Sequence, residues 1–579
     1  MGDRLHISLI HKFHISNRNL ILITAFSFFI ISLALVSLHE TPVNGYEISI
    51  YQKIPFIVWI AIIFGLINGG FLFFRYYGLE KKLWAIGLFE ILLCNAILIS
   101  LNFLRGSIYL GKGDSLTYLG YSKDIILNGF LPQYNFYPSI SLLISSTSVI
   151  TNLTGIELVQ LLPAFFLTVY LLSIFVWSKS LSHKRGFIAA MLFASLPLFF
   201  ATFIPPIIYE ALCVLMIPIF LYSLQKSKSK DIRYISIICV FFVFFTLGHP
   251  LVSLALLLYM IIIFVTERFF RLEKKTVTGP LLLFSSVVFF IWIANQAVLV
   301  NSITITLNQM ISGPSQTALT DFEGFASKLG LLTTVQSILS STIDDIIFIL
   351  LSIWAIILIW KNAWRTNSIT PYFACFIGGT ILLATLIVTT NQSPSRFVNL
   401  NFNMIFTIPL VGFLLYQKQK NGKVTLVRLI LFLIVVSLIV SISSIYQDPI
   451  QMTPNGTITI SETSGVNWFI NQKNATIGIL TVYTEPSRFA DMIYGHIYSQ
   501  NHAESFIKKD PGNHFTSIMS SNKTIENSYL IISSYDRDAY TTLWQNVNRY
   551  EEKDFQALPL SNMINKNFDN GGFSCYIRA

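Results

Sequence analysis

The feature that most limits how this 579-residue chain can fold is a series of apolar runs, each about as long as a membrane crossing. A helix needs about 20 predominantly apolar residues to span roughly 30 Å of hydrocarbon. Only 12% of the residues are charged, against about 25% in a soluble domain, so lipid must solvate much of the surface. We predict a polytopic α-helical membrane protein with about 13 transmembrane helices, at residues 20–38, 54–74, 83–103, 156–178, 187–204, 207–224, 234–248, 251–266, 279–300, 344–360, 371–390, 398–416 and 425–445.

Two parts of this pattern have a second interpretation. The apolar stretch at 138–153 is rich in Ser and Thr, and we expect it to lie along the membrane interface instead of crossing. The runs at 234–248 and 251–266 are short and meet at His249 and Pro250. They form either two crossing helices or one re-entrant feature.

Basic residues are divided unequally between the two sets of loops. With the N-terminus in the cytoplasm, most of the 39 Lys and Arg residues fall in cytoplasmic segments. Short cytoplasmic loops of membrane proteins are enriched in these residues. We therefore predict a multi-pass protein of the plasma membrane, with a cytoplasmic N-terminus and an extracytoplasmic C-terminal tail. Outside the tail, the basic residues expected on the exterior side are Lys53, Arg105, Lys112, Lys123, Lys328 and Arg396.

The tail, residues 447–579, has the composition of a soluble domain. Short runs typical of strands alternate in it with runs typical of helices, which indicates a small α/β layer domain. The strand-like runs are 476–483, 529–535 and 573–577, and the helix-like runs are 462–471, 487–499 and 538–549.

These features divide the chain into three parts. Residues 1–82 form an N-terminal cytoplasmic segment and an added transmembrane hairpin. Residues 83–446 form a transmembrane core whose exterior loop, 104–155, is the expected catalytic loop. Residues 447–579 form the extracytoplasmic soluble α/β domain.

The exterior loop 104–155 concentrates polar residues near the membrane surface. Ionisable groups near membrane depth are costly, so by default they indicate function. The loop carries Asp114, Asp124 and Tyr137 among further aromatic residues. Asp114 and Ser115 can also be explained as a helix cap, because both side chains accept hydrogen bonds from free N–H groups at a helix start. A cap position can present a catalytic carboxylate, so the two interpretations are compatible.

Three further polar residues fall at helix ends on the same side. Arg396 precedes an apolar span, where its side chain either extends toward lipid headgroups or binds a phosphate through two parallel N–H donors. Glu210 follows a Pro-Pro pair at a helix start, where negative charge is favoured. His249 precedes a proline and either caps a helix or faces a cavity shared with Glu210.

Other kinds of chemistry find little support in the sequence. No GxxxxGK[ST], GxSxG or HExxH motif is present, and the five cysteines form no CxxC pair or Cys/His cluster with metal-ligand spacing. An ATP-driven or zinc-dependent role is therefore not indicated. No resident cofactor is expected, a divalent metal stays open, and we expect no nucleic-acid partner.

Several of these features occur together in one known family. Gly113-Asp114 opens the first large exterior loop. The segment 128–138, rich in aromatic residues and proline, comes later in this loop. An interfacial apolar stretch follows it, and Thr-Gly precedes the next span. A Gly-His-Pro lies at a later helix end, before the soluble tail. This arrangement resembles the GT-C superfamily of membrane glycosyltransferases, which includes protein O-mannosyltransferases, arabinosyl and aminoarabinose transferases and large unassigned archaeal groups. The resemblance extends from residue 83 onward.

The resemblance implies an enzyme that moves a sugar from a polyprenyl (dolichyl)-phosphate donor to an exterior lipid, glycan or protein acceptor. Asp114 matches the family's catalytic residue and is expected to act as general base. Arg396 matches the position that holds the donor phosphate, where charge builds as the carrier leaves. The residues expected to line the same cavity are Tyr137, Glu210, His249 and Asp124.

The sequence departs from better-defined members of that family in two ways. Ser115 follows Asp114, where protein O-mannosyltransferases carry an acidic pair. The tail lacks the WWDYG-type motif of oligosaccharyltransferases, which argues against transfer of a whole oligosaccharide and leaves the tail's role open. Two other function classes remain: a transporter or lipid flippase, which places polar groups near the bilayer midplane, and a non-catalytic scaffold that displays the C-terminal domain.

Overall fold

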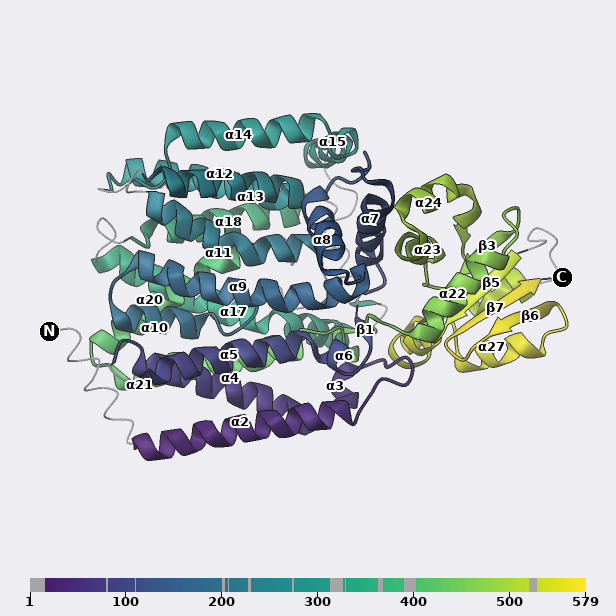
Figure 1. Cartoon of the computed structure of the whole chain (residues 1–579), viewed down its shortest axis with the longest axis horizontal. Coiled ribbons are helices and arrows are strands. Elements are labelled where there is room, and N and C mark those ends of the chain that lie inside the picture. The colour runs from purple at the N-terminus through teal and green to yellow at the C-terminus, as the bar shows by residue number, and fades with distance from the viewer. Residues whose placement is uncertain are drawn as a thin grey trace.

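The helices form one bundle, and the C-terminal domain lies at one end of it, which we call the domain end (Figure 1). In hydrocarbon every backbone polar group must be bonded within the protein, so apolar runs of this length become helices. The computed structural model describes residues 16–79, 82–109, 111–199, 204–206, 208–227, 231–272, 275–312, 326–327, 330–362, 368–389, 402–519 and 528–578.

The first part of the chain forms α2 (Asn17–His39), α3 (Ile50–Lys53), α4 (Phe56–Tyr76), α5 (Leu83–Ile99) and α6 (Leu101–Leu104). Small residues let α4 and α5 approach closely. A Cβ atom on Gly69 would lie only 2.7 Å from the Gly87 carbonyl oxygen. The buried Glu90 carboxylate accepts hydrogen bonds from Ser27 and Asn68, which joins α5 to both α2 and α4.

Each of the thirteen predicted runs contains a helix. Within the described residues, seven helices are long and apolar enough to cross a membrane, and shorter apolar helices lie beside them. The remaining bundle elements are α9 (Gly155–Leu181), α10 (Arg185–Ala194), α11 (Tyr209–Ser227), α12 (Ile232–Gly248), α13 (Pro250–Phe269), α14 (Gly279–Ala294), α15 (Ala297–Ser312), α17 (Leu331–Asn362), α18 (Thr370–Thr389), η2 (Phe402–Phe406), α20 (Thr407–Lys420) and α21 (Val424–Ser443).

The structure refines the predicted spans in two places. The run at 187–204 is helical only over α10, and 195–199 leave the helix. Pro197 explains this, because proline lacks an N–H donor and disfavours helical backbone in the residue before it. The runs that meet at His249 form two separate helices side by side, α12 and α13, of 17 and 20 residues. The interpretation as two helices is therefore correct.

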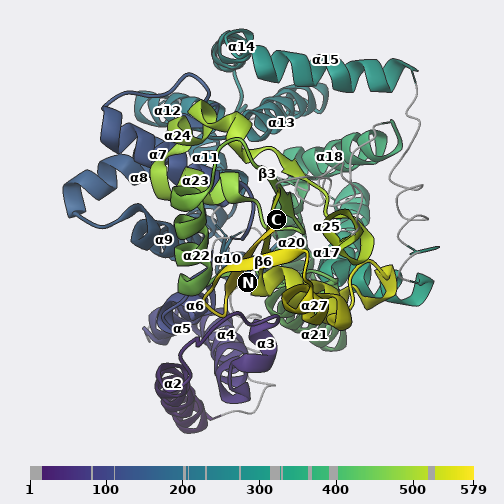
Figure 2. The same cartoon turned by 90° about the vertical axis from the view of Figure 1, so that its right-hand side faces the viewer.

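Both helices of the exterior loop 104–155 run across the domain end instead of along the bundle, as α15 also does (Figures 1 and 2). They are α7 (Asp114–Asn128) and α8 (Pro138–Thr151). Gly129 and Asn152 follow them in the left-handed conformation that commonly closes a helix. The orientation of α8 agrees with the interfacial position expected for 138–153.

The C-terminal domain has a five-stranded mixed sheet in the order β4-β3-β5-β7-β6. Its β3 pairs in parallel with β4 and β5, while β7 pairs antiparallel with β5 and β6. Each of the three predicted strand runs contains a strand, although 534–535 already belong to a helix. The run 538–549 forms only short turns of π and 3-10 helix. The domain's elements are α22 (Ile460–Gln472), β3 (Gly478–Thr481), α23 (Pro486–Tyr494), α24 (His496–Asn501), β4 (Lys508–Lys509), α25 (Thr516–Met519), β5 (Ser528–Ser533), α26 (Ser534–Asp538), α27 (Glu552–Ala557), β6 (Ile564–Asp569) and β7 (Phe573–Arg578).

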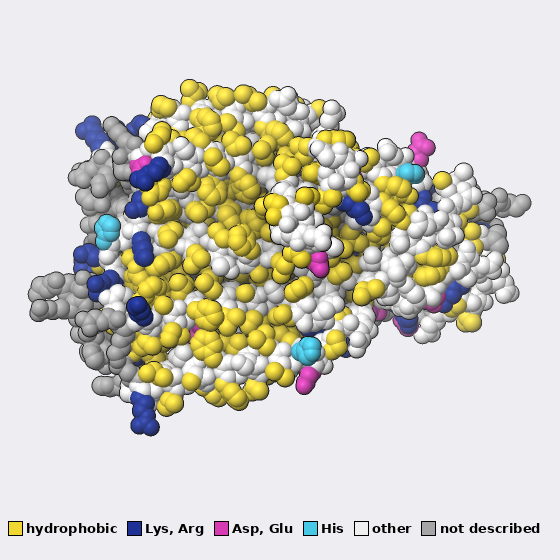
Figure 3. Space-filling model, viewed as in Figure 1, with side chains coloured by type: hydrophobic (Ala, Val, Ile, Leu, Met, Phe, Trp, Pro, Cys, Tyr) yellow, Lys and Arg dark blue, Asp and Glu magenta, His cyan; other side chains and the backbone are white. Residues whose placement is uncertain are grey.

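The domain is tied to the bundle by backbone pairing. β1 (Ile108–Tyr109), which precedes α7, pairs antiparallel with β2 (Thr457–Ile458), which precedes α22. Viewed from the domain end, α23 and α24 lie over α7 (Figure 2). Hydrophobic side chains cover much of the bundle surface, and Lys and Arg gather at the end opposite the domain (Figure 3).

Candidate active site beneath the C-terminal domain

Asp114 is the first residue of α7, and its side chain is 63% exposed. Gly113 holds the N-cap position, and no side chain caps the helix there. Ser115 is buried and donates its hydroxyl hydrogen bond to the Pro206 carbonyl oxygen. The interpretation of Asp114 and Ser115 as a helix cap is therefore wrong, since one carboxylate is left accessible and the neighbouring hydroxyl fixes α7 to the bundle.

Tyrosine rings connect Asp114 to the bundle below it. Tyr118, one turn after Asp114, stacks on Tyr209 with ring centroids 3.8 Å apart and meets Tyr137 edge-on at 6.4 Å. Burial raises the pKa of the Tyr118 hydroxyl well above its ordinary value, and the nearby charges of Asp114 and Glu210 raise it further. Tyr118 is therefore within electrostatic reach of both carboxylates.

Glu210 and His249 face each other beside these rings. The His249 Nε2 atom lies 3.9 Å from a Glu210 carboxylate oxygen, and each side chain is only 14% exposed. Tyr137 stacks on the His249 ring at 5.2 Å. Within the described residues, Glu210 Oε1, His249 Nδ1 and Ser139 Oγ are buried without a hydrogen-bond partner. Buried polar groups are normally satisfied, so this cluster has free capacity to bind hydroxyl groups.

Asp124 lies ten residues after Asp114 on α7, about 15 Å along the helix at 1.5 Å per residue. Its side chain is buried against the C-terminal domain, where one oxygen accepts the Ile497 amide at 3.0 Å. Burial raises the pKa of its carboxyl, and the hydrogen bond from Ile497 opposes that rise. The structure thus places Asp124 in the interface between α7 and the domain, apart from Asp114.

Four of the six residues selected from sequence come together at the domain end: Asp114, Tyr137, Glu210 and His249. They lie on four different elements or their ends, α7, α8, α11 and the α12–α13 junction. Arg396 lies outside the described residues.

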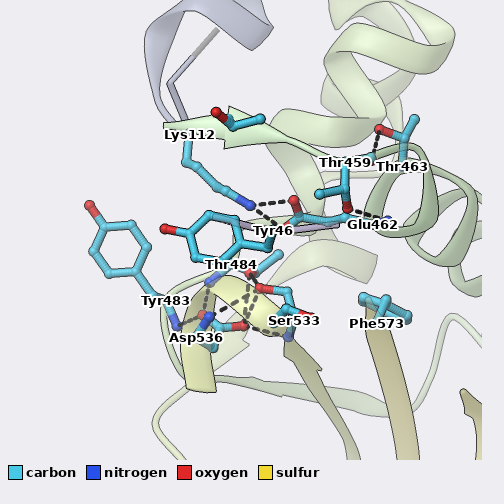
Figure 4. Close-up of polar contacts among 12 residues, drawn as sticks. Tyr46, Lys112, Thr459, Glu462, Thr463, Tyr483, Thr484, Ser533, Asp536 and Phe573 are labelled. Atoms are coloured by element: carbon cyan, nitrogen blue, oxygen red, sulfur yellow. Dashed lines mark hydrogen bonds and ion pairs between the residues drawn. The ribbon is translucent and has the colours of Figure 1, made fainter. Parts of the chain in front are cut away.

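Sequence reasoning missed a buried ion pair two residues before Asp114. Lys112 pairs with Glu462 of α22, with side-chain exposures of 4% and 2%. The Lys112 ammonium also lies 4.5 Å from the ring centroid of Tyr535. Its distance from the ring centroid of Tyr46 is 5.8 Å, and Figure 4 shows this ring beside the ion pair with Glu462. Burial raises the pKa of the Glu462 carboxyl, and Lys112 opposes that rise. The paired charges fix the start of the loop to the domain.

Sequence reasoning also missed the partner of Asp114 itself. Arg488 of α23 places Nη2 2.9 Å from Asp114 Oδ1. Its Nη1 donates a hydrogen bond to Thr117 Oγ1 at 2.6 Å. The C-terminal domain therefore reaches the candidate catalytic carboxylate directly. No local sequence signal could have paired residues this far apart in the chain.

Few metal-ligating side chains surround Asp114 among the described residues. Within the described ranges, no group of three or more His, Cys, Asp and Glu side chains could hold a metal ion. One oxygen of Asp114 already faces a guanidinium. The described residues therefore give Asp114 a cationic partner, Arg488.

No family model and no curated protein matches the chain. Among solved structures, it is similar to an oligosaccharyltransferase of Archaeoglobus fulgidus in the apo form, with 11% identity and a TM-score of 0.49 over 86% of this chain and 75% of that one. It is also similar to ArnT from Cupriavidus metallidurans bound to undecaprenyl phosphate, with 10% identity and a TM-score of 0.44 over 86% of this chain and 98% of that one. The apo state of that protein matches with 10% identity, a TM-score of 0.45 and the same coverage.

Proposed function

We propose that this protein is a membrane glycosyltransferase of the GT-C type, which moves a sugar from a polyprenyl-phosphate donor to an exterior lipid, glycan or protein acceptor. The observation that carries the proposal is an accessible carboxylate, Asp114, next to a half-buried cluster of Tyr137, Glu210 and His249 at the domain end. The loop resemblance described from sequence points to the same carboxylate. A transporter path would need polar groups distributed toward the bundle midplane, whereas this cluster lies at one end.

In the proposed reaction, Asp114 acts as general base. Its carboxylate takes the proton from an acceptor hydroxyl while that oxygen forms a bond to the anomeric carbon of the donor sugar. The bond between the anomeric carbon and the phosphate oxygen breaks, and its electron pair leaves with the polyprenyl phosphate. A guanidinium at Arg396 would stabilise the charge that builds on the departing phosphate.

The buried cluster would bind the sugar or the acceptor. Unpartnered atoms of Glu210, His249 and Ser139 suit hydroxyl groups, and Tyr137 offers an aromatic face. These groups would place the reacting hydroxyl near Asp114. Correct placement of reacting groups supplies a large part of catalysis.

The proposed orientation puts the domain end outside the cytoplasm. The opposite end carries most of the Lys and Arg visible on the surface (Figure 3), which the positive-inside rule assigns to the cytoplasm. A lipid-linked donor in the outer leaflet would then reach Asp114 from the membrane side.

The test is Asp114→Asn in membranes supplied with polyprenyl-phosphate sugars and with lipid or protein acceptors. We expect transfer to fall about 10²-fold or more, the range for loss of a general base. Asp510→Asn is the matched control. Asp510 is 64% exposed and also pairs with an arginine, but it lies in the C-terminal domain and outside the candidate site. Unchanged transfer by Asp114→Asn would rule out the assigned base.

A further inference from the structure

The C-terminal domain contacts one face of α7 along most of its length. Thr117 donates a hydrogen bond to Asp491 Oδ2 at 2.5 Å, and Lys123 donates to the Ile493 carbonyl oxygen. Gly120 lies so close that an added Cβ atom would be 2.8 Å from the Asp491 carbonyl oxygen. Asp124 continues the same face. Residues three and four apart share one side of a helix, so the domain docks on a single face that begins at Asp114.

Arg488 is the contact at the start of that face. Besides Asp114 and Thr117, its Nε lies 3.5 Å from Glu485, which itself pairs with Lys508. The guanidinium is planar and fixed in shape, so contacts on three sides determine its orientation. It therefore holds Asp114 Oδ1 in a defined position relative to α7.

The ion pair between Arg488 and Asp114 is poorly suited to holding the domain in place. The two side chains are 32% and 63% exposed, and exposed ion pairs add little stability. Docking has stronger sources nearby, in the buried Lys112–Glu462 pair and the buried Asp124. The Arg488–Asp114 pair therefore contributes less docking free energy than these buried contacts do. It is also the contact that touches the candidate base.

We propose that Arg488 is a positioning residue, by which the C-terminal domain orients the Asp114 carboxylate for proton transfer. This inference rests on the proposed function. Arg488 holds Oδ1 and leaves Oδ2 to take the proton from the acceptor hydroxyl. The domain is then an integral part of the active site, and glycosyl transfer requires it to be docked.

The pairing can be tested without any sugar transfer. In the full-length protein in nanodiscs, accessible carboxyl groups are coupled to glycine methyl ester with a water-soluble carbodiimide, and labelling is measured by mass spectrometry. Arg488→Ala should increase labelling of Asp114 several-fold and leave Asp510 unchanged. Arg549→Ala should do the reverse, because Arg549 pairs with the equally exposed Asp510. Unchanged Asp114 labelling in Arg488→Ala would overturn the proposal.

Kinetics then test the positioning role. Arg488→Ala should lower kcat about 10- to 100-fold, the loss expected from a misplaced catalytic group, with the donor KM nearly unchanged. Arg488→Lys should recover part of that loss. The control Arg537→Ala, which removes an exposed ion pair far along the chain from α23, should leave both constants unchanged.

The outcomes separate the two proposals. A variant Arg488→Ala with the kcat of the wild type overturns the positioning role. Faster hydrogen exchange along the whole of α7 in Arg488→Ala would also overturn the positioning role, because Arg488 would then be a docking contact. A wild-type protein that transfers no sugar overturns the proposed function and the positioning role together, while the labelling result still decides whether the ion pair exists.

Discussion

Two ion pairs join the C-terminal domain to the same short stretch of chain, and they differ in almost every physical respect. Lys112 and Glu462 are 4% and 2% exposed, and aromatic rings surround the ammonium. Two residues later, Asp114 pairs with Arg488 at exposures of 63% and 32%. A buried pair is costly to break, because the remaining charge has neither water nor partner. An exposed pair is cheap to break, since water replaces the lost partner.

The difference suggests a division of roles between neighbouring positions. The buried pair fixes where the loop lies, and the exposed pair fixes how one carboxylate points. A catalytic base must exchange a proton with a substrate, so it cannot be sealed as Glu462 is. This division of roles predicts different consequences for substitutions on its two sides.

The largest effect is expected for Glu462→Ala, which leaves the Lys112 ammonium buried and unpaired. Removing one partner of a buried ion pair costs about 3–5 kcal/mol. We expect the free energy of opening of α22 and β1 amides, measured by hydrogen exchange in nanodiscs, to fall by that order. Glu552→Ala is the control, because it removes the partner of the half-exposed Arg537 and should change the same quantity by less than about 1 kcal/mol. Equal effects of the two variants would contradict the division of roles.

A second large effect is expected where the domain meets the far end of α7. Gly495 has φ +100°, and an added Cβ atom would lie 2.1 Å from Asp124 Oδ1. Gly495→Ala should therefore weaken docking by about 1–3 kcal/mol through backbone strain, and by more through displacement of Asp124. Gly571→Ala separates the two causes, since Gly571 has φ +82° with no atom within 4 Å of the added Cβ. If Gly571→Ala lowered the melting temperature as much as Gly495→Ala, strain alone would account for the loss.

The sequence predicted the bundle well because the bilayer imposes the length and apolarity of each helix. It also predicted the sheet runs, since alternating side chains mark strands locally. The run at 538–549 failed as a helix because short segments in a domain follow tertiary packing more than local propensity. Pro197 was visible in the sequence and could have shortened the span at 187–204.

The candidate site was predicted only in part. Asp114, Glu210 and His249 could be selected because polar groups at helix ends near a membrane are unusual, and each signal is local. Their shared surroundings could not be derived, nor could the pairing of Lys112 with Glu462, which are separated by 350 residues. Nothing in the sequence around Arg488 indicated that it pairs with Asp114. Its importance comes from the docking of α23 on α7.

Asp114→Asn tests the exposed side of the comparison directly. The variant keeps a polar side chain of the same shape and removes the charge that Arg488 contacts. Since an exposed ion pair contributes about 0–1 kcal/mol, hydrogen exchange of α7 amides should change by no more than that, even though sugar transfer is lost. A decrease in opening free energy as large as that of Glu462→Ala would show that Asp114 is a structural anchor.

The smallest effect concerns Asp124, whose carboxyl has a raised pKa because it is buried against the domain. The docked state then binds a proton more tightly than the open state, so this carboxyl favours docking most below its ordinary pKa. That contribution is lost as pH rises through the raised pKa. Asp124→Asn keeps an oxygen to accept the Ile497 amide but cannot titrate. We expect its melting temperature to fall less than that of the wild type between pH 4 and pH 7.

His496 and Asp491 also face Asp124 from the domain, and both influence its pKa. Because this coupling is mutual, the difference between the two melting curves reports Asp124 together with its interaction with these two groups. Asp510→Asn, at an exposed position, should follow the wild-type curve throughout. Parallel curves for Asp124→Asn and the wild type would mean that Asp124 is as hydrated as Asp114. The buried and exposed ends of the α7 face would then no longer differ in the way the structure indicates.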